Sequence, residues 1–173
     1  MEPNSTDPLR EQLAIMRNSL LDEKMLDIHF RLLETLELEN KEKPNFVEDT
    51  MNMYFESSAE KIAIFEDALE NPPSDFSDLK RHIYQFKGSS GSVGAIKVMN
   101  EVVRLIECID KGDIEGAKIV VQHIKKERDT LEGRLEPYFQ VSFRSNYQKS
   151  IFDSFCGNKL SYPENLNAPK ALI

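Results

Sequence analysis

The chain has 173 residues, of which 40% are hydrophobic and 30% charged, and its formal net charge is −8 at pH 7. This length fits one domain with a sizeable core, and the composition is typical of a helix-rich globular protein. The negative charge argues against nucleic acid as a partner, because such binding depends on a basic surface. No apolar run approaches 18 residues, so we expect neither a membrane span nor a membrane partner.

Most of the chain follows the spacing of three and four residues that is typical of amphipathic helices. A first helix, capped by Asp7, carries the apolar residues Leu9, Leu13, Met16 and Leu20. A second, from roughly Glu23 to Glu39, carries Leu26, Phe30, Leu33 and Leu36, with Ile28 and Leu32 beside them. This surplus of apolar residues either covers the end of a bundle or forms part of a partner surface.

A third helix is predicted from about Asn45 to Glu70, with Pro44 suited to its first turn. Its inward positions repeat at nearly heptad spacing and are Val47, Met51, Tyr54, Phe55, Ser58, Ile62, Phe65 and Leu69. Asn71-Pro72-Pro73 ends this helix, and the short loop implies that the fourth helix returns antiparallel to it. The fourth helix, capped by Ser74 or Asp75, has the apolar face Phe76, Leu79, Ile83 and Phe86.

The glycine- and serine-rich run from Gly88 to Gly94 should weaken or end the fourth helix. A fifth helix then carries Ala95, Val98, Met99, Val102, Ile106 and Ile109 on its inward face. Lys111-Gly112 ends it, and Asp113 caps a sixth helix with inward positions at Ala117, Val120, Val121, Ile124, Arg128, Leu131, Leu135 and Tyr138. The predicted fold is all-α: an antiparallel up-down-up-down four-helix bundle, with the first two helices lying across it.

Residues 1–142 are therefore expected to form one helical bundle domain with a core from about 44 to 140. Residues 143–173 form a C-terminal extension that is partly flexible, from Gly157 onward. The apolar residues of this extension are Phe143, Tyr147, Ile151, Phe152 and Phe155. They either continue the sixth helix or pack back as a separate short segment.

The fourth helix also presents a candidate docking position. Tyr84 lies off its apolar face near Lys80 and Arg81, with Gly88 one turn later and Lys87 beside that glycine. A glycine one turn from an exposed hydroxyl lets the backbone of a partner approach closely. The same residues also fit an ordinary helix C-terminus, where glycine ends the helix and lysine interacts favourably with its dipole.

The central motif is Tyr84-Gln85-Phe86-Lys87-Gly88-Ser89-Ser90-Gly91-Ser92-Val93-Gly94-Ala95. It resembles the motif of the histidine-containing phosphotransfer (HPt) proteins, and specifically of the plant class in cytokinin signalling, which reads His-Gln-Leu-Lys-Gly-Ser-Ser-Ser-Ser-hydrophobic-Gly-Ala. Further likeness lies at Leu26-Asp27, Pro44-Asn-Phe-Val47 and Arg134-Leu-Glu136, so that it covers roughly residues 20–140. The family fold, a four-helix bundle with flanking N-terminal helices, agrees with the periodicity.

The resemblance implies a component of a two-component phosphorelay, whose partners are the receiver domains of sensor histidine kinases and response regulators. The residues that it implies for partner binding are Tyr84, Gln85, Lys87, Gly88, Ser89, Ser90, Leu26 and Phe30. We expect a monomer without cofactor or metal. Cytoplasm and nucleus are the expected locations, since Cys108 and Cys156 suggest reduced thiols, the N-terminus lacks the pattern of a secretory signal, and the family occurs in both compartments.

The chain departs from the family at its central residue, because Tyr84 stands where the family has the histidine that accepts phosphate. An imidazole has a free nitrogen lone pair at pH 7, whereas a phenol, with an ordinary pKa of about 10, stays protonated and needs a base to act as a nucleophile. We therefore expect a pseudo-phosphotransfer protein without catalytic activity. It would bind receiver domains without accepting phosphate and act as a negative regulator.

An active phosphorelay mediator is the alternative, with another histidine as acceptor. His82 lies about 200° around the helix from Tyr84 and has Phe86 one turn later instead of glycine, so a structural role is favoured for it. His29 and His123 lie on other helices, without a matching glycine or lysine, and fit ordinary surface positions.

Three other functions have weaker support. The glycine-rich run followed by Lys97 suggests a nucleotide site, but no strand precedes it and the Gly-Lys-Ser/Thr end of a P-loop is missing. Three scattered histidines and two separated cysteines form no metal-ligand set. Phosphorylation of Tyr84 beside Lys87 and Arg81 would imitate the charge of a phosphohistidine, but the flanking sequence does not require it.

Overall fold

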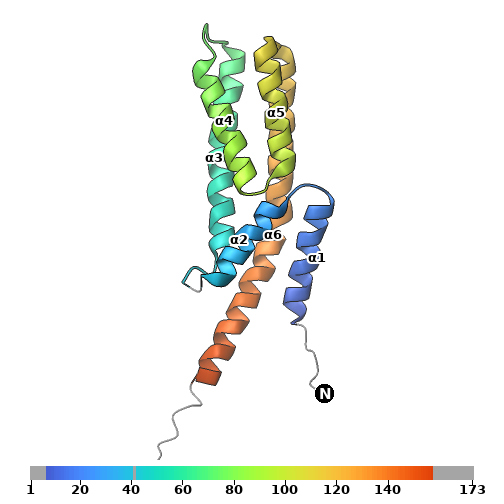
Figure 1. The fold of residues 1–173 in the computed structure, drawn as a ribbon, viewed down its shortest axis with the longest axis vertical. Helices are drawn as coiled ribbons and strands as arrows, with labels where there is room; N and C mark the ends of the chain where they lie inside the picture. The colour runs from blue at the N-terminus through green and yellow to red at the C-terminus, as the bar shows by residue number, and fades with distance from the viewer. Residues whose placement is uncertain (1–6, 41, 158–173) are drawn as a thin grey trace, which may run out of the picture.

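The computed structural model describes residues 7–40 and 42–157, and these fold into α-helices and connecting turns (Figure 1). The helices are α1 (Pro8–Asp22), α2 (Ile28–Glu39), α3 (Phe46–Glu70), α4 (Ser77–Ser92), α5 (Ile96–Lys111) and α6 (Ile114–Gly157). The predicted all-α class is confirmed. The predicted flexible tail beyond Gly157 lies outside the described residues.

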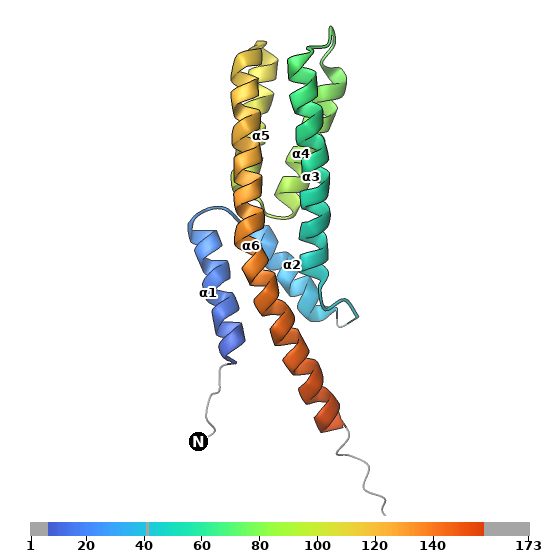
Figure 2. The same ribbon diagram turned by 180° about the vertical axis from the view of Figure 1, so that it is seen from behind.

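A four-helix bundle forms the main body of the molecule. Helices α3, α4, α5 and the first half of α6 run side by side in alternating directions, as Figures 1 and 2 show from opposite sides. All eight inward positions predicted for α3 are buried. The largest fully buried side chains include Phe65 and Phe86, whose rings lie 6.1 Å apart between α3 and α4. The predicted up-down-up-down bundle is thus confirmed.

Arg128 explains why the inward stripe of α6 contains a charged residue. Its guanidinium lies over the ring of Phe55, with 5.3 Å between the guanidinium carbon and the ring centroid. One Nη atom donates to the Phe55 carbonyl at 2.9 Å, and Nε donates to the buried Ser58 Oγ at 3.2 Å. The outer Nη reaches Glu132 at 2.8 Å. Arg128 therefore joins α6 to α3 while its charge stays paired.

Helices α1 and α2 occupy one end of the bundle, where α1 runs beside the second half of α6 and α2 packs against α3 and the end of α4 (Figure 1). The predicted start of α2 at Glu23 is wrong. Lys24 has a left-handed backbone with φ of 54°, which separates the two helices, and the Asp27 carboxylate accepts from the His29 amide at 2.8 Å as the N-cap. Asp7 caps α1, as predicted.

The glycine- and serine-rich run ends α4, as predicted, but the helix continues through Gly88 and stops only at Ser92. Tertiary packing compensates for the poor helix propensity of this run. Ser90 is buried, and a Cβ at Gly91 would lie 3.3 Å from the sulfur of Met99 on α5. The helix stops only near Gly94, whose φ is 78°.

Gly112 ends α5 in a left-handed conformation and Asp113 caps α6, as predicted. Leu105 is buried in α5, which the predicted inward set omitted, whereas Ile106 is only half-buried. Of the two alternatives for residues 143–157, the structure has the first: they continue α6 as one helix to Gly157. The boundary of the bundle domain at residue 142 stays a prediction.

We predict that a side chain added at Gly94 lowers the free energy of unfolding more than one added at Gly112, which has the same left-handed backbone. A Cβ at Gly94 would come within 2.7 Å of the Phe30 nitrogen, whereas one at Gly112 meets nothing within 4 Å. Gly112→Ala should lower the free energy of unfolding by about 1–2 kcal/mol through backbone strain alone. Gly94→Ala should cost at least about 1 kcal/mol more, because atoms must also shift. Urea unfolding of both variants measures the difference, and equal losses would contradict this account.

Candidate functional site

Tyr84 lies in the middle of α4 on the side that faces solvent. Its neighbour Ile83 and the later Phe86 are fully buried, so the turn of the helix leaves the Tyr84 side chain 53% exposed. Gly88 is one turn further along, and a Cβ built on it would meet nothing within 4 Å. The absence of a side chain there is therefore not required by internal packing, and it leaves the space beside the Tyr84 ring open.

Cations from α3 and α4 surround this position. Lys80 Nζ pairs with the Asp110 carboxylate of α5 at 2.7 Å, and this hydrogen bond raises the pKa of Lys80. Arg81 pairs with Asp78 at 3.0 Å, and Lys61 of α3 donates to Gln85 Oε1 at 3.2 Å.

Lys87, by contrast, has no carboxylate partner in the part of the chain that the structure describes. It is therefore the cation of α4 that is most available to an incoming acidic group. The sequence pattern predicted the exposure of Tyr84 and the cations of α4. It did not identify Lys61 and Asp110, because their positions depend on how α3 and α5 pack.

The two serines after Gly88 have structural roles. Ser89 is half-buried, and its hydroxyl donates to the Phe86 carbonyl at 3.1 Å. Ser90 is fully buried, with its Oγ 3.0 Å from the hydroxyl of Tyr54 on α3. Burial raises the pKa of Tyr54 to about 12, so this pair stays neutral. The prediction that Ser90 contacts a partner is wrong, because the residue lies inside the bundle.

The predicted apolar docking patch at Leu26 and Phe30 is also wrong. Leu26 is 2% exposed and Phe30 0%, and Phe30 packs edge-on against Tyr138 at 5.8 Å between ring centroids. Phe30 is drawn inward because the α2 backbone approaches Gly94 so closely. The exposed apolar residues of α2 are instead Ile28, Leu32, Leu36 and Leu38. The wide apolar stripe of α2 indicated that two faces of the helix are apolar, but only packing decides which of them is exposed to solvent.

None of the three histidines shares the environment of Tyr84. His82 is half-buried, and its Nδ1 is enclosed without a hydrogen-bond partner among the described residues. His29 Nδ1 lies 3.0 Å from Asp27, next to the N-cap of α2. His123 lies on α6, 3.6 Å from Glu101.

Within residues 7–40 and 42–157, no group of His, Cys, Asp or Glu side chains gathers in the way that a metal ion requires. None of the helices in those same residues combines the length and apolarity needed to cross a membrane.

The bundle and the exposed face of α4 define the class of the protein: the Hpt domain family matches residues 49–134. Pseudo histidine-containing phosphotransfer protein 2 of Oryza sativa subsp. japonica is 37% identical over 77% of this chain and 87% of its own length. Histidine-containing phosphotransfer protein 4 of Arabidopsis thaliana is 44% identical over 68% of this chain and 91% of its own length. The chain therefore belongs to the histidine-containing phosphotransfer protein family.

Solved structures agree with this assignment. The crystal structure of a histidine-containing phosphotransfer protein from Medicago truncatula matches with a TM-score of 0.74 and 28% identity, covering 84% of this chain and 97% of that one. A maize histidine-containing phosphotransfer protein matches with a TM-score of 0.72 at 24% identity, covering 79% of this chain and 98% of that one. The similarity thus extends beyond the four-helix bundle.

We predict that Tyr54 and Ser90 stabilise the bundle as a pair. Tyr54→Phe or Ser90→Ala should each lower the free energy of unfolding by about 1–3 kcal/mol, because each leaves a buried hydroxyl without its partner. The double variant should lose less than the sum, by about 1 kcal/mol. Thermal or urea unfolding of the three variants measures this coupling. Additive losses would show that the two hydroxyls do not interact.

Proposed function

We propose that this chain is a pseudo-phosphotransfer protein, which binds receiver domains of sensor histidine kinases and response regulators but does not accept phosphate from them. It acts as a negative regulator of the phosphorelay by occupying the surface that an active phosphotransfer protein would use. The observation that carries this proposal is the exposed phenol of Tyr84 at the position where the family motif has its phosphate-accepting histidine.

The chemistry of Tyr84 supports the loss of transfer. A phenol becomes a nucleophile only when a base removes its proton, and the neighbours of Tyr84 along the exposed side of α4 are Lys80, Arg81, Lys87 and Gly88. None of these is a general base at neutral pH. A phosphate on tyrosine is, moreover, an ordinary ester and a poor donor to a carboxylate, so the reverse step of a relay would also fail.

The environment of Tyr84 supports the retention of binding. The open space over Gly88 allows close approach by a partner, and Lys87 offers a cation to the acidic active site of a receiver domain. The exposed side chains Ile28, Leu32 and Leu36 of α2 supply the apolar area that Leu26 and Phe30 cannot. Helices α2 and α4 lie on the same side of the molecule in Figure 1, so one partner can contact both.

The relatives that match this chain include both pseudo and ordinary histidine-containing phosphotransfer proteins. Their names therefore do not distinguish the two functions, and the proposal depends on the residue at position 84. Three of the rice relatives are called pseudo histidine-containing phosphotransfer proteins, at 37%, 35% and 34% identity. The Arabidopsis relative, at 44% identity, is called a histidine-containing phosphotransfer protein.

A transfer assay tests the proposal directly. A receiver domain carrying labelled aspartyl phosphate is mixed with the wild type and with Tyr84→His. We expect label on Tyr84→His and only background on the wild type, because only the imidazole is nucleophilic at neutral pH. Binding of the unphosphorylated receiver, measured by calorimetry, should differ between the two by less than about threefold, or under about 1 kcal/mol.

His82→Ala is the control for the alternative function. If the wild type accepts acid-labile phosphate and His82→Ala does not, the protein is an active mediator that uses another histidine, and the proposal is wrong. If neither the wild type nor Tyr84→His binds any receiver domain tested, the docking surface itself has a different partner.

We also predict that the exposed face of α2 takes part in receiver binding. Leu32→Ser combined with Leu36→Ser should weaken binding about tenfold or more, or about 1.4 kcal/mol, because both side chains are half exposed and lose apolar contact area. Ile119→Ser, an exposed position on the first half of α6, is the matched control and should bind like the wild type. Equal binding by all three proteins would exclude α2 from the interface.

A further inference from the structure

The second half of α6 carries exposed aromatic side chains that the phosphotransfer surface does not use. Phe143 is 57% exposed, Tyr147 61% and Ile151 41%, at successive spacings of four residues. The rings of Phe143 and Tyr147 stack with 6.4 Å between centroids and 11° between planes. They form a flat apolar surface on a helix that continues beyond the four-helix bundle (Figure 2). An exposed apolar face of this kind is typical of an interaction surface.

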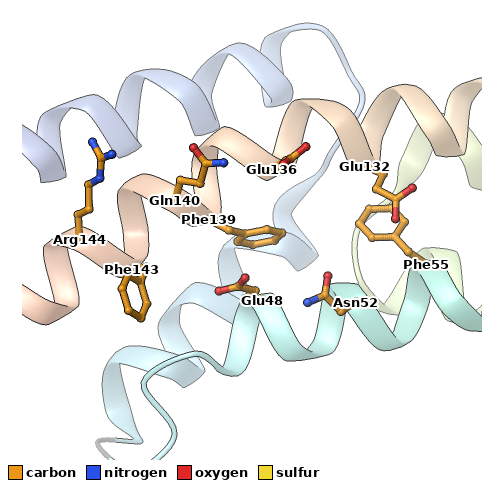
Figure 3. A pocket seen from close by; sticks show the side chains of 9 residues that line it. All are labelled: Glu48, Asn52, Phe55, Glu132, Glu136, Phe139, Gln140, Phe143 and Arg144. Atoms are coloured by element: carbon orange, nitrogen blue, oxygen red, sulfur yellow. The ribbon is translucent and has the colours of Figure 1, made fainter.

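A groove of about 680 Å³ between α3 and α6 adjoins these rings. Figure 3 shows the Phe139 ring between the two helices, with Glu48 and Asn52 of α3 beside it. Carboxylates dominate the polar part of the groove, which is lined by Glu48, Glu132 and Glu136. The basic residue in its lining is Arg144, at the far end. One end of this surface is therefore acidic, and the other end is aromatic with a cation.

The acidic and aromatic parts lie on one face of α6. At 100° per residue, the positions 133, 136, 140, 143, 144 and 147 fall within an arc of about 100°. Position 133 is an exposed glycine in a helix interior, and a Cβ there would meet nothing within 4 Å. Packing within the chain does not require this glycine and helix propensity disfavours it, so Gly133 leaves bare backbone open to another molecule.

We propose that two copies of the chain associate through this face, with their α6 helices antiparallel and a two-fold axis near Gln140. An antiparallel pair centred there places residues equally far from 140 opposite each other. Arg144 of one copy then meets Glu136 of the other, four residues on either side of the axis, and Tyr147 meets Gly133, seven residues on either side. The bare backbone at Gly133 makes room for the Tyr147 ring.

Charge complementarity selects a second copy as the occupant. A two-fold axis brings the acidic end of each surface onto the cationic end of the other, so the same pair of opposite charges forms twice. Among the described residues neither Arg144 nor Glu136 has a salt-bridge partner within its own chain. This association replaces the monomer expected from the sequence.

The association does not depend on the proposed function. The groove lies between α3 and α6, which are the helices nearest the viewer in Figure 2, whereas α4 lies in front of α3 in Figure 1. Both surfaces can therefore be occupied together. Self-association can be measured in a protein that does not bind receiver domains, and receiver binding in one that does not associate. The two proposals can therefore fail separately.

The test is a charge exchange followed by light scattering after size exclusion, at protein concentrations up to about 100 μM, within the range of weak self-association. The wild type should approach twice the monomer mass. Glu136→Arg alone and Arg144→Glu alone should each remain monomeric, because each places like charges opposite each other twice. An equimolar mixture of the two variants should again reach the dimer mass, since all facing pairs are then opposite.

Two further variants separate the interface from the fold. Gly133→Leu should abolish association while retaining the wild-type helical circular dichroism, because its side chain projects into open space. Ile119→Ser, at an exposed apolar position elsewhere on α6, should associate like the wild type. A wild type that stays monomeric at the highest concentration would overturn the proposal. So would single charge variants that dimerise as well as the wild type, or a mixture that stays monomeric.

Discussion

The close approach between Gly94 and the start of α2 is the constraint on which the arrangement of this molecule depends. The Asp27 amide donates to the Gly94 carbonyl at 2.9 Å, and no space remains there for a side chain on Gly94. This contact places α2 beside the end of α4 and turns Phe30 inward against Tyr138. The other face of α2 is then exposed, next to the helix that carries Tyr84. A single backbone contact thus defines which residues a partner can reach.

Polar groups inside the bundle complete the connection between helices. Arg128 joins α6 to the Phe55 carbonyl of α3, while the hydroxyls of Tyr54 and Ser90 join α3 to α4. At the other end, Tyr138 donates to Glu34 of α2, and both burial and this carboxylate raise the pKa of the phenol. Because these groups are paired, the long helices have a defined register, and the face of α4 is held rigid beneath Tyr84.

Under the proposed function, the rigid scaffold and Tyr84 together explain why loss of phosphate transfer need not mean loss of binding. Recognition of a partner depends on shape, apolar area and charge, which we propose that many residues on α2 and α4 supply. Phosphate transfer depends on one nucleophile with a suitable pKa. Replacement of an imidazole by a phenol removes the second property and leaves the scaffold intact. On this proposal, a family member becomes a competitor through a single substitution.

The sequence by itself determined which segments are helices, where Asp7, Gly112 and Asp113 delimit them, which side of α3 is buried and that Tyr84 is exposed. Each of these depends on periodicity or local capping, which are encoded within a few residues. Tertiary structure decided that α4 continues through Gly88, that Ser90, Leu26 and Phe30 are buried and that α6 extends to Gly157. These outcomes depend on neighbouring helices. Burial of side chains compensates for the poor helix propensity of glycine and serine in α4. In α2, which has two apolar faces, the neighbouring helices determine which face is buried.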